Sequence, residues 1–157
     1  MIAELIQNYR KVLLKFKVGK CGKNLKVFGK VKINGGEHIE IGDNCRLNEG
    51  VYLLGAGKII IKDFVTLSPY SKIITASYDT SAWGKKENFK KEHIKHVKKS
   101  VFIQESTWIG TSAIILPGVQ LTGKGIIVAA GSVVTKSIND DFVLVGGNPA
   151  HIIKRFV

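Results

Sequence analysis

Two histidines lie three residues apart in the string KEHIKH, inside a lysine-rich stretch that spans residues 76–100. Neutral imidazole accepts protons near neutral pH, so His93 and His96 are candidates for a general base, and His96 is nearer to the segment that follows. A metal site built from histidines needs a third ligand, and the sequence offers none with suitable spacing. The pair therefore predicts acid–base chemistry without a metal.

A repeat of six residues surrounds this stretch and defines the elements that must position it. From residue 103 the chain reads IQESTW, IGTSAI, ILPGVQ and LTGKGI, and the first half contains IGDNCR, LNEGVY, IKDFVT and LSPYSK. The leading residues are aliphatic: Ile41, Leu47, Leu53, Ile61, Leu67, Ile73, Ile103, Ile109, Ile115, Leu121 and, after an extra residue, Val128. The fifth places hold small or β-branched residues: Cys45, Val51, Val65, Ser71, Thr107, Ala113, Val119 and Ser132.

A period of six fits neither an α-helix nor a simple alternating strand. It fits a triangular coil in which each side is a short strand, the leading aliphatic points inward and the fifth residue lies near a tight corner. Stacked turns then bury a continuous aliphatic column that no single hexamer could form. Antiparallel hairpins are a poorer explanation of so many six-spaced matches. The sequence therefore predicts an all-β parallel β-helix.

The segments outside the repeat divide the chain into three parts. Residues 1–20 form an N-terminal part whose apolar residues recur at spacings of three and four, which predicts an amphipathic helix. This helix either caps the open end of the coil or lies on an anionic membrane through its basic residues. Residues 21–146 form the β-helix, with one long inserted loop at 76–100, and residues 147–157 form a C-terminal tail.

Composition limits the class of protein. The chain has 157 residues, 45% of them hydrophobic, and a net charge of +12, which favours anionic partners. Aromatic residues do not interleave with the basic ones as nucleic-acid stacking platforms do, so we expect no nucleic-acid partner. The N-terminus does not resemble a signal peptide, so we expect a cytoplasmic protein whose basic helix permits contact with the inner face of the membrane.

Several strings resemble a known family. TWIGTSAIILPGV, VAAGSVVTK and GGNPAHIIKR, in this order, are similar to the hexapeptide-repeat acetyltransferases, nearest to the galactoside, maltose and polysaccharide O-acetyltransferases. The resemblance covers roughly residues 39–157. It implies a left-handed β-helix, which periodicity alone does not give because parallel crossovers are right-handed in about 98% of cases. It also implies a homotrimer that binds acetyl-CoA between subunits and modifies a sugar or a polysaccharide precursor.

The resemblance also assigns residues. Trp108 matches the family's WIG tryptophan near the thioester, and Asn48 in RLNEGV matches the position that binds an acceptor sugar hydroxyl. Basic residues in the tail suit the phosphates of the cofactor. The matched cofactor positions are Trp108, Gly110, Thr111, Ala130, Thr135, Lys136, Pro149, His151 and Lys154. The simpler explanation is that the Gly and Ala residues are corner residues of the coil and that Lys136 and Lys154 are surface charges.

The sequence departs from the family at the catalytic histidine. Tyr78 in ITASYD stands where the family has its histidine, and a phenol ordinarily titrates near pH ~10, which makes it a poor base at pH 7. Three hypotheses follow: His96 or His93 supplies the imidazole, Tyr78 acts with lysine neighbours or orients the acceptor, or the protein is a weak or inactive relative.

We predict an acetyl-CoA-dependent O-acetyltransferase that acts on a sugar of a cell-surface polysaccharide or its precursor. The alternatives are an N-acetyltransferase for a nucleotide-linked amino sugar, because an amine needs less help from a base, and a non-catalytic β-helical scaffold. A carbonic anhydrase of the same fold would need three histidines around the coil, which this sequence lacks.

Overall fold

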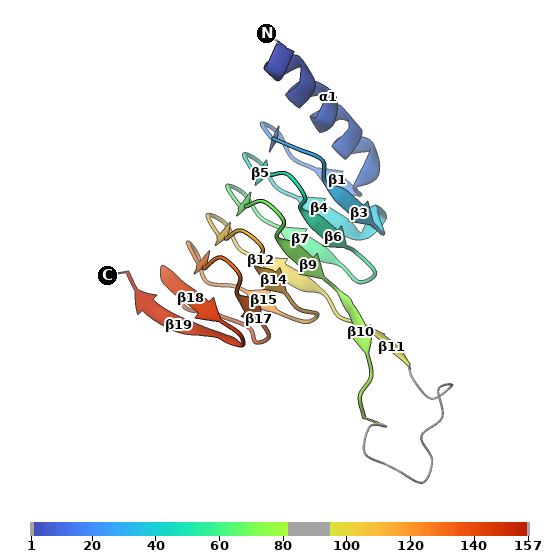
Figure 1. Ribbon diagram of the computed structural model, residues 1–157. Coiled ribbons are helices and arrows are strands. Elements are labelled where there is room, and N and C mark those ends of the chain that lie inside the picture. The colour runs from blue at the N-terminus through green and yellow to red at the C-terminus, as the bar shows by residue number, and fades with distance from the viewer. Residues whose placement is uncertain (1, 82–94, 157) are drawn as a thin grey trace.

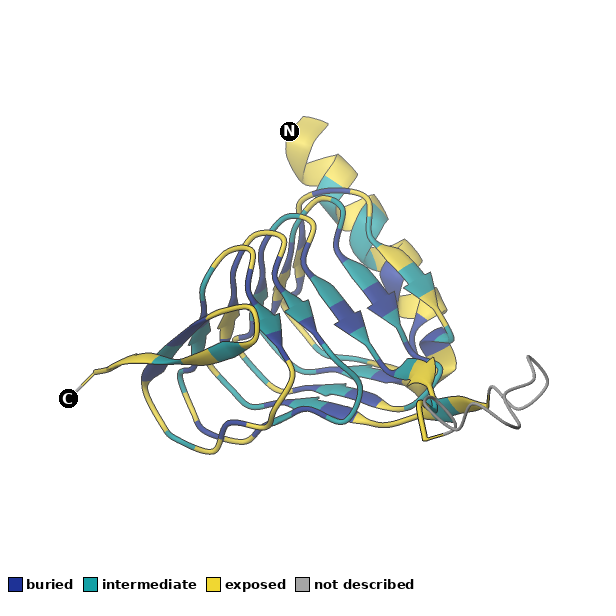
Figure 2. Cartoon of the chain, turned by 60° about the horizontal axis from the view of Figure 1, so that its bottom comes forward, coloured by how far each residue is buried: buried dark blue, intermediate teal, exposed yellow. Residues whose placement is uncertain are grey.

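The chain coils into a prism with three flat sides (Figures 1 and 2). A computed structural model describes residues 2–81 and 95–156. Sheet A contains, in spatial order, β1 (Lys20–Cys21), β4 (Ile39–Ile41), β7 (Ile59–Ile61), β12 (Val101–Ile103) and β15 (Gln120–Leu121). Sheet B contains β2 (Lys26–Val27), β5 (Arg46–Leu47), β8 (Thr66–Leu67), β13 (Trp108–Ile109), β16 (Ile127–Val128), β18 (Val143–Gly147) and β19 (Ala150–Arg155). Sheet C contains β3 (Lys32–Asn34), β6 (Tyr52–Leu54), β9 (Lys72–Ile74), β14 (Ile114–Ile115) and β17 (Val133–Val134).

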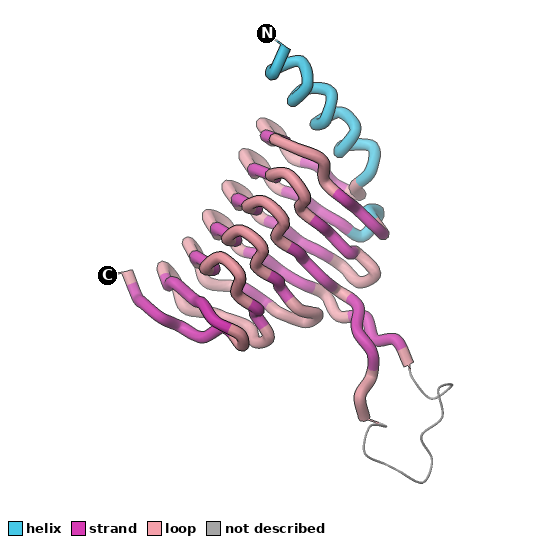
Figure 3. The backbone as a smooth tube through the Cα atoms, viewed as in Figure 1, coloured by secondary structure: helices cyan, strands magenta, loops and turns pink. Residues whose placement is uncertain are grey.

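From β1 to β9 and from β12 to β17, successive strands along the chain belong to successive sheets, so three strands make one turn of the coil (Figure 3). Neighbouring strands within sheets A, B and C are parallel, except for the last pair of sheet B, β18 and β19. The sides meet at three edges, which we name by the sheets they join: the A–B, B–C and C–A edges. The B–C edge consists of residues 28–31, 48–51, 68–71, 110–113 and 129–132 in successive turns.

The aliphatic column predicted from the repeat is the core. All eleven leading residues of the hexamers are at most 2% exposed, and the fifth-place residues of the repeat are buried as well. Figure 2 shows buried and exposed residues alternating along the short strands. In each two-residue strand of sheets A, B and C from β5 onward, the second residue points inward and the first points outward. The predicted parallel β-helix is therefore confirmed.

Backbone hydrogen bonds join each turn to the next, and at some corners they leave no room for a side chain. The Gly110 N–H donates to the Val128 carbonyl at 2.8 Å. A Cβ atom at Gly110 would lie 2.6 Å from that oxygen and 2.7 Å from the Ala130 nitrogen. Glycine is therefore required here by the close approach of two turns.

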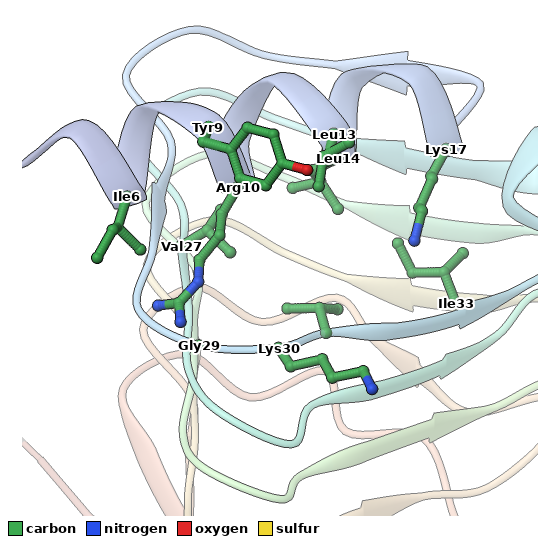
Figure 4. Close-up of a pocket in the computed structure, with 11 residues that line it drawn as sticks. Ile6, Tyr9, Arg10, Leu13, Leu14, Lys17, Val27, Gly29, Lys30 and Ile33 are labelled. Carbon is green, nitrogen blue, oxygen red and sulfur yellow. The ribbon is translucent and has the colours of Figure 1, made fainter. Parts of the chain in front are cut away.

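The N-terminal helix α1 (Ile2–Lys17) contacts the first turn along a narrow line. Leu14 is its one buried residue, 3% exposed, and the Arg10 guanidinium donates to the Phe28 carbonyl at 2.8 Å. A cavity of about 350 Å³ separates the rest of the helix from residues 27–33 (Figure 4). The apolar face predicted to cap the coil is exposed: Ile2, Leu5, Ile6, Tyr9, Leu13 and Phe16 are 39 to 86% exposed. The helix packs through a different side because Leu14 lies outside that stripe.

The inserted stretch leaves the prism at the C–A edge as an arm (Figure 1). Strands β10 (Ala76–Tyr78) and β11 (His96–Lys98) pair antiparallel within a stretch that the sequence predicted as a loop. Buried Thr75 anchors the arm, because its hydroxyl donates to the Leu54 carbonyl and its own carbonyl accepts from the Lys99 N–H at 2.9 Å. At the end of the prism opposite α1, β19 folds back on β18 and adds an antiparallel strand to sheet B.

Shortening one column residue tests the importance of the core. Ile115→Ala removes a fully buried side chain, and we expect it to lower the free energy of unfolding by about 2–5 kcal/mol. Ile2→Ala removes the same atoms from a side chain that is 75% exposed, and we expect a change below about 0.5 kcal/mol. Urea denaturation measures both. Equal effects would contradict the assignment of the column as the core.

Candidate functional site

Equivalent residues stack along the B–C edge, one in each turn. Asn48 and Ser68 donate their backbone N–H groups to Leu67 and Ile109, and Gly110 and Ala129 donate theirs to Val128 and Val145, at 2.8 to 3.1 Å. Because neighbouring parallel strands lie about 4.8 Å apart, these four residues form a row roughly 14 Å long. The row lines up three predicted site positions, at Asn48, Gly110 and the turn that contains Ala130.

Trp108 lies beside this row on the outer face of sheet B. Its indole is half exposed, and the indole N–H donates to the Ser68 hydroxyl at 2.8 Å. Ser68 itself is buried, so the hydrogen bond fixes the indole against the B–C edge. The sequence analysis missed Ser68. Ser68 directly follows the leading aliphatic of its hexamer, as Asn48 and Gly110 do in theirs. This shared position in the repeat could have identified it from the sequence.

The outer rim of the B–C edge offers backbone donors and little steric bulk. Within the described chain, the N–H groups of Thr111 and Ala130 donate to no other backbone group. The equivalent residue one turn earlier is Pro69, which has no N–H, so the coil does not need a donor at this place. Nothing lies within 4 Å of the position that a Cβ of Gly131 would take. This rim can therefore receive an extended ligand that contains amide groups.

Asn48 is half buried and partly committed to the coil. Its side-chain N–H₂ group donates to the Leu67 carbonyl at 2.7 Å. This bond fixes the amide and leaves its oxygen as an acceptor for a hydroxyl group of a ligand. This arrangement is compatible with both interpretations of Asn48, as a corner residue of the coil and as a residue that binds the acceptor.

The predicted tail residues lie on the hairpin that ends sheet B. Pro149 is in the turn between β18 and β19, His151 pairs with Gly146, and Lys154 pairs with Leu144. All three side chains are exposed. The Gly147 N–H donates to the Ser132 hydroxyl at 3.2 Å, which holds this hairpin against the B–C turn that contains Ala130. Cations at this end of the row can pair with phosphate groups.

Thr135 and Lys136 lie elsewhere. They follow β17 and are exposed on the C–A edge, so the whole of sheet C separates them from the row on the B–C edge. A ligand that lies along the B–C edge of one chain therefore does not reach them on the same chain. These two residues share their edge with the β10–β11 arm.

On the arm, the structure brings together two of the three candidate bases. Tyr78 and His96 are directly opposite each other in the β10–β11 pair, and their ring centroids are 4.5 Å apart with a tilt of 47°. The Asp79 N–H donates to the Lys95 carbonyl at 2.8 Å, which fixes this register. Hydrogen bonds from Ser81 hold the pKa of the Asp79 carboxyl below its ordinary value. His93, the third candidate, lies outside the described residues.

The candidate site is thus divided between two edges of the prism. The B–C edge carries Trp108, Asn48 and the ligand rim, whereas the C–A edge carries the imidazole. No group of three or more His, Cys, Asp and Glu side chains that could hold a metal occurs in residues 2–81 and 95–156. His38, the residue before β4, is at the surface, and its Nε2 atom lies 3.7 Å from Oε1 of Glu37.

Comparisons with known proteins agree with this architecture. No protein-family profile matches the chain. A maltose O-acetyltransferase from Clostridium difficile has 31% sequence identity and a TM-score of 0.83, with 96% of this chain and 76% of that one covered. A hexapeptide-repeat acetyltransferase from Vibrio cholerae, solved with acetyl coenzyme A, has 29% identity and a TM-score of 0.81, with 96% and 78% covered.

A third relative, from Escherichia coli, is named provisionally as a colanic acid biosynthesis acetyltransferase. It is 29% identical over 154 residues, which cover 98% of this chain and 79% of the relative. The similarity to these proteins extends over the helix, the coil and the tail, and with the C. difficile protein it combines close structural agreement with 31% identity. The chain therefore belongs to the hexapeptide-repeat acetyltransferases.

Proposed function

We propose that the protein transfers the acetyl group of acetyl-CoA to a hydroxyl group of a sugar in a cell-surface polysaccharide or its precursor. The outer rim of the B–C edge, where the N–H groups of Thr111 and Ala130 donate to no other backbone group, lies beside the fixed indole of Trp108 and is the observation that carries this proposal. Its free N–H groups suit the amides of the pantetheine arm, and the cations of the tail suit the phosphates. The relatives named above support both the donor and the sugar acceptor.

In this reaction the acceptor oxygen attacks the thioester carbon, and the base removes the hydroxyl proton. The tetrahedral intermediate then collapses, the carbon–sulfur bond breaks, and the thiolate of CoA takes a proton. We assign the base to the neutral imidazole of His96, because it lies directly across from the tyrosine that replaces the family's histidine. Tyr78 then acts as a positioning residue whose ring packs against the imidazole.

The division of the site between two edges supports a homotrimer. On one chain, His96 and Trp108 belong to edges that sheet C separates. If the C–A edge of one subunit faces the B–C edge of the next, the arm brings His96 to the neighbour's Trp108 and Asn48. Thr135 and Lys136 then join the same cleft as Gly110, Thr111 and Ala130. A closed ring of three copies gives every subunit one complete site.

Calorimetric titration with acetyl-CoA tests the donor site. We expect about one site per chain, with a dissociation constant between micromolar and sub-millimolar. Ala130→Glu places a carboxylate on the ligand rim, and we expect affinity to fall at least about tenfold. Thr122→Glu makes the same addition at an exposed position of the A–B edge and should leave affinity unchanged. Absence of binding at millimolar acetyl-CoA would favour a β-helical scaffold without enzymatic activity.

Replacing the candidate bases one at a time tests the mechanism. We expect His96→Gln to lower kcat by about 10²- to 10⁴-fold with little change in the KM for acetyl-CoA, because a general base acts on the chemical step. Tyr78→Phe keeps the ring and should cost less than about tenfold.

His93→Gln is the matched control, because His93 belongs to the same inserted stretch of the sequence. A large loss in this variant with normal activity in His96→Gln would move the base to His93. Release of CoA thiol in the presence of neutral sugars and amino sugars measures all three variants. A preference for amino sugars that does not depend on His96 would support N-acetylation, for which an unprotonated amine needs less help from a base.

We also propose that α1 rests on an anionic membrane. Cations lie on both flanks of its exposed apolar stripe. Residues three or four apart are neighbours on a helix surface, so Lys17 lies beside Leu13 and Lys15 lies beside Val12. Residues 1–34 contain nine Lys and Arg but one acidic residue, Glu4, whereas the whole chain has 24 and 12. An apolar stripe between cations is typical of interfacial helices. No helix within residues 2–81 and 95–156 has the length and apolar character needed to cross a bilayer.

Co-sedimentation with vesicles tests this contact. We expect binding to vesicles that contain phosphatidylglycerol, weakened by salt, and little binding to phosphatidylcholine alone. The double variant Leu5→Gln/Phe16→Gln should lose at least about tenfold in partitioning. The control Phe142→Gln/Ile153→Gln makes the same change at exposed positions of the opposite end. A stripe variant that changes the oligomeric state and leaves vesicle binding intact would instead assign the stripe to a subunit contact.

A further inference from the structure

A second cavity, of about 350 Å³, lies on sheet B near the N-terminal end of the prism. Three successive turns line it, each with one corner residue and one outward strand residue. The residues are Asn24 and Lys26, Asn44 and Arg46, and Phe64 and Thr66. Neither the repeat nor the family resemblance assigns a role to any of them.

Two cations of the cavity are held side by side. Lys26 and Arg46 are register partners on neighbouring parallel strands, and both side chains are exposed on the outer face of sheet B. Like charges directly opposite each other on adjacent strands destabilise a sheet. Among the residues that the structure describes, neither cation forms an ion pair.

The acidic residues next to the corners of this cavity accept hydrogen bonds from backbone N–H groups. Asp43 accepts from the Lys23 N–H at 2.7 Å, and Asp63 accepts from the Asp43 N–H at 2.8 Å. Asp63 also lines a separate small cavity on the sheet A side with Glu40. No acidic side chain lines the cavity of Lys26 and Arg46. The cavity therefore holds two positive charges that none of its lining residues neutralises.

The amide side chains add polar groups beside these cations. The Asn24 side-chain N–H₂ group donates to the Asn44 side-chain oxygen at 3.4 Å, so the two amides are stacked one turn apart. Both residues are at left-handed corners, with φ of 53° and 58°, a conformation that asparagine tolerates. A guanidinium, an ammonium and amides together suit the oxygens of a phosphate group.

The cavity lies on the same face of sheet B as Trp108 of the proposed reaction centre. Along the outer face of sheet B, Arg46 pairs with Thr66, and Thr66 pairs with Trp108. Two strand spacings give roughly 10 Å between the backbone positions of Arg46 and Trp108. Asn48, the proposed acceptor residue, lies two residues beyond Arg46. A group bound to Arg46 and Lys26 therefore lies roughly 10–14 Å from Trp108 along the sheet.

We propose that the acceptor carries a phosphate or pyrophosphate group and that Lys26 and Arg46 bind it. The acceptor class is thus a sugar attached to phosphate, whether free as a sugar phosphate or linked through pyrophosphate to a nucleoside or a lipid. This inference rests on the proposed acetyltransferase function and narrows its substrate. Lys26 and Arg46 recognise the substrate and take no part in proton transfer.

Binding of inorganic pyrophosphate tests the cavity apart from catalysis. The protein is first saturated with CoA, so that the phosphate positions of the donor site are filled, and pyrophosphate is then titrated by calorimetry. We expect binding that weakens with salt and that falls about 10- to 100-fold in Lys26→Gln/Arg46→Gln. Lys62→Gln, an exposed lysine beside Asp63, should bind as the wild type does. Unchanged binding in the double variant, or no binding to a protein that binds CoA, would overturn the proposal.

Acetyl-transfer assays with different acceptors distinguish the possible sources of the phosphate. The acceptors are a sugar 1-phosphate, a nucleoside diphosphate sugar, a lipid-pyrophosphoryl sugar and the neutral methyl glycoside of the same sugar. We expect at least one phosphorylated acceptor to exceed the neutral one in kcat/KM, and the ratio to fall at least tenfold in Arg46→Gln. Equal use of neutral and phosphorylated acceptors would overturn the proposal while leaving the acetyltransferase function in place. Failure to bind acetyl-CoA would remove the acetyltransferase function itself.

Discussion

The stacking of one turn on the next is the constraint on which the rest of the structure depends. Each turn must place an aliphatic side chain inside every side of the triangle, while its backbone bonds to the turns before and after it. With two or three residues per strand and four per corner, the chain has few outward positions, and they recur in fixed columns. Chemistry on such a scaffold is therefore arranged in rows along its edges and faces. Trp108, Asn48 and the cations of sheet B are all members of such rows.

The sequence was sufficient to predict this scaffold because the leading aliphatic residues of the repeat are the residues that point into the core. The leading aliphatics, the small fifth residues and the extra residue before Val128 all correspond to features of the coil. The pairing of Tyr78 with His96 was not predictable, because it depends on the register of a hairpin whose strands carry no repeat. Nor was the exposure of the α1 stripe, since an amphipathic pattern identifies an apolar face and does not say which surface covers it. Lys26 and Arg46 were hidden among many lysines, and only the register of β2 and β5 makes them neighbours.

The distribution of charge gives the molecule two different ends. Near α1, basic residues dominate, and the cavity of Lys26 and Arg46 opens among them. Toward the tail, acidic side chains balance the cations, as in the contacts between Lys124 and Glu105 and between Arg155 and Asp140. A lipid-linked acceptor held at a membrane would approach the basic end, and a soluble donor such as CoA would lie along the row toward the tail. The two substrates would then meet near Trp108 from opposite directions.

The regular rise of the coil fixes the distance between residues on different turns. Between Gly110 and the β18–β19 hairpin the B–C edge contains one intervening turn, at residues 129–132, so the tail with Pro149 and His151 is about 10 Å below Gly110. Adding or deleting one turn after β13 would change this span by about 4.8 Å while leaving the core pattern intact. If the donor binds along this edge as proposed, the number of turns after Trp108 fixes the distance between the groups that hold its two ends. The number of turns, more than the identity of any one side chain, would then limit the length of the donor.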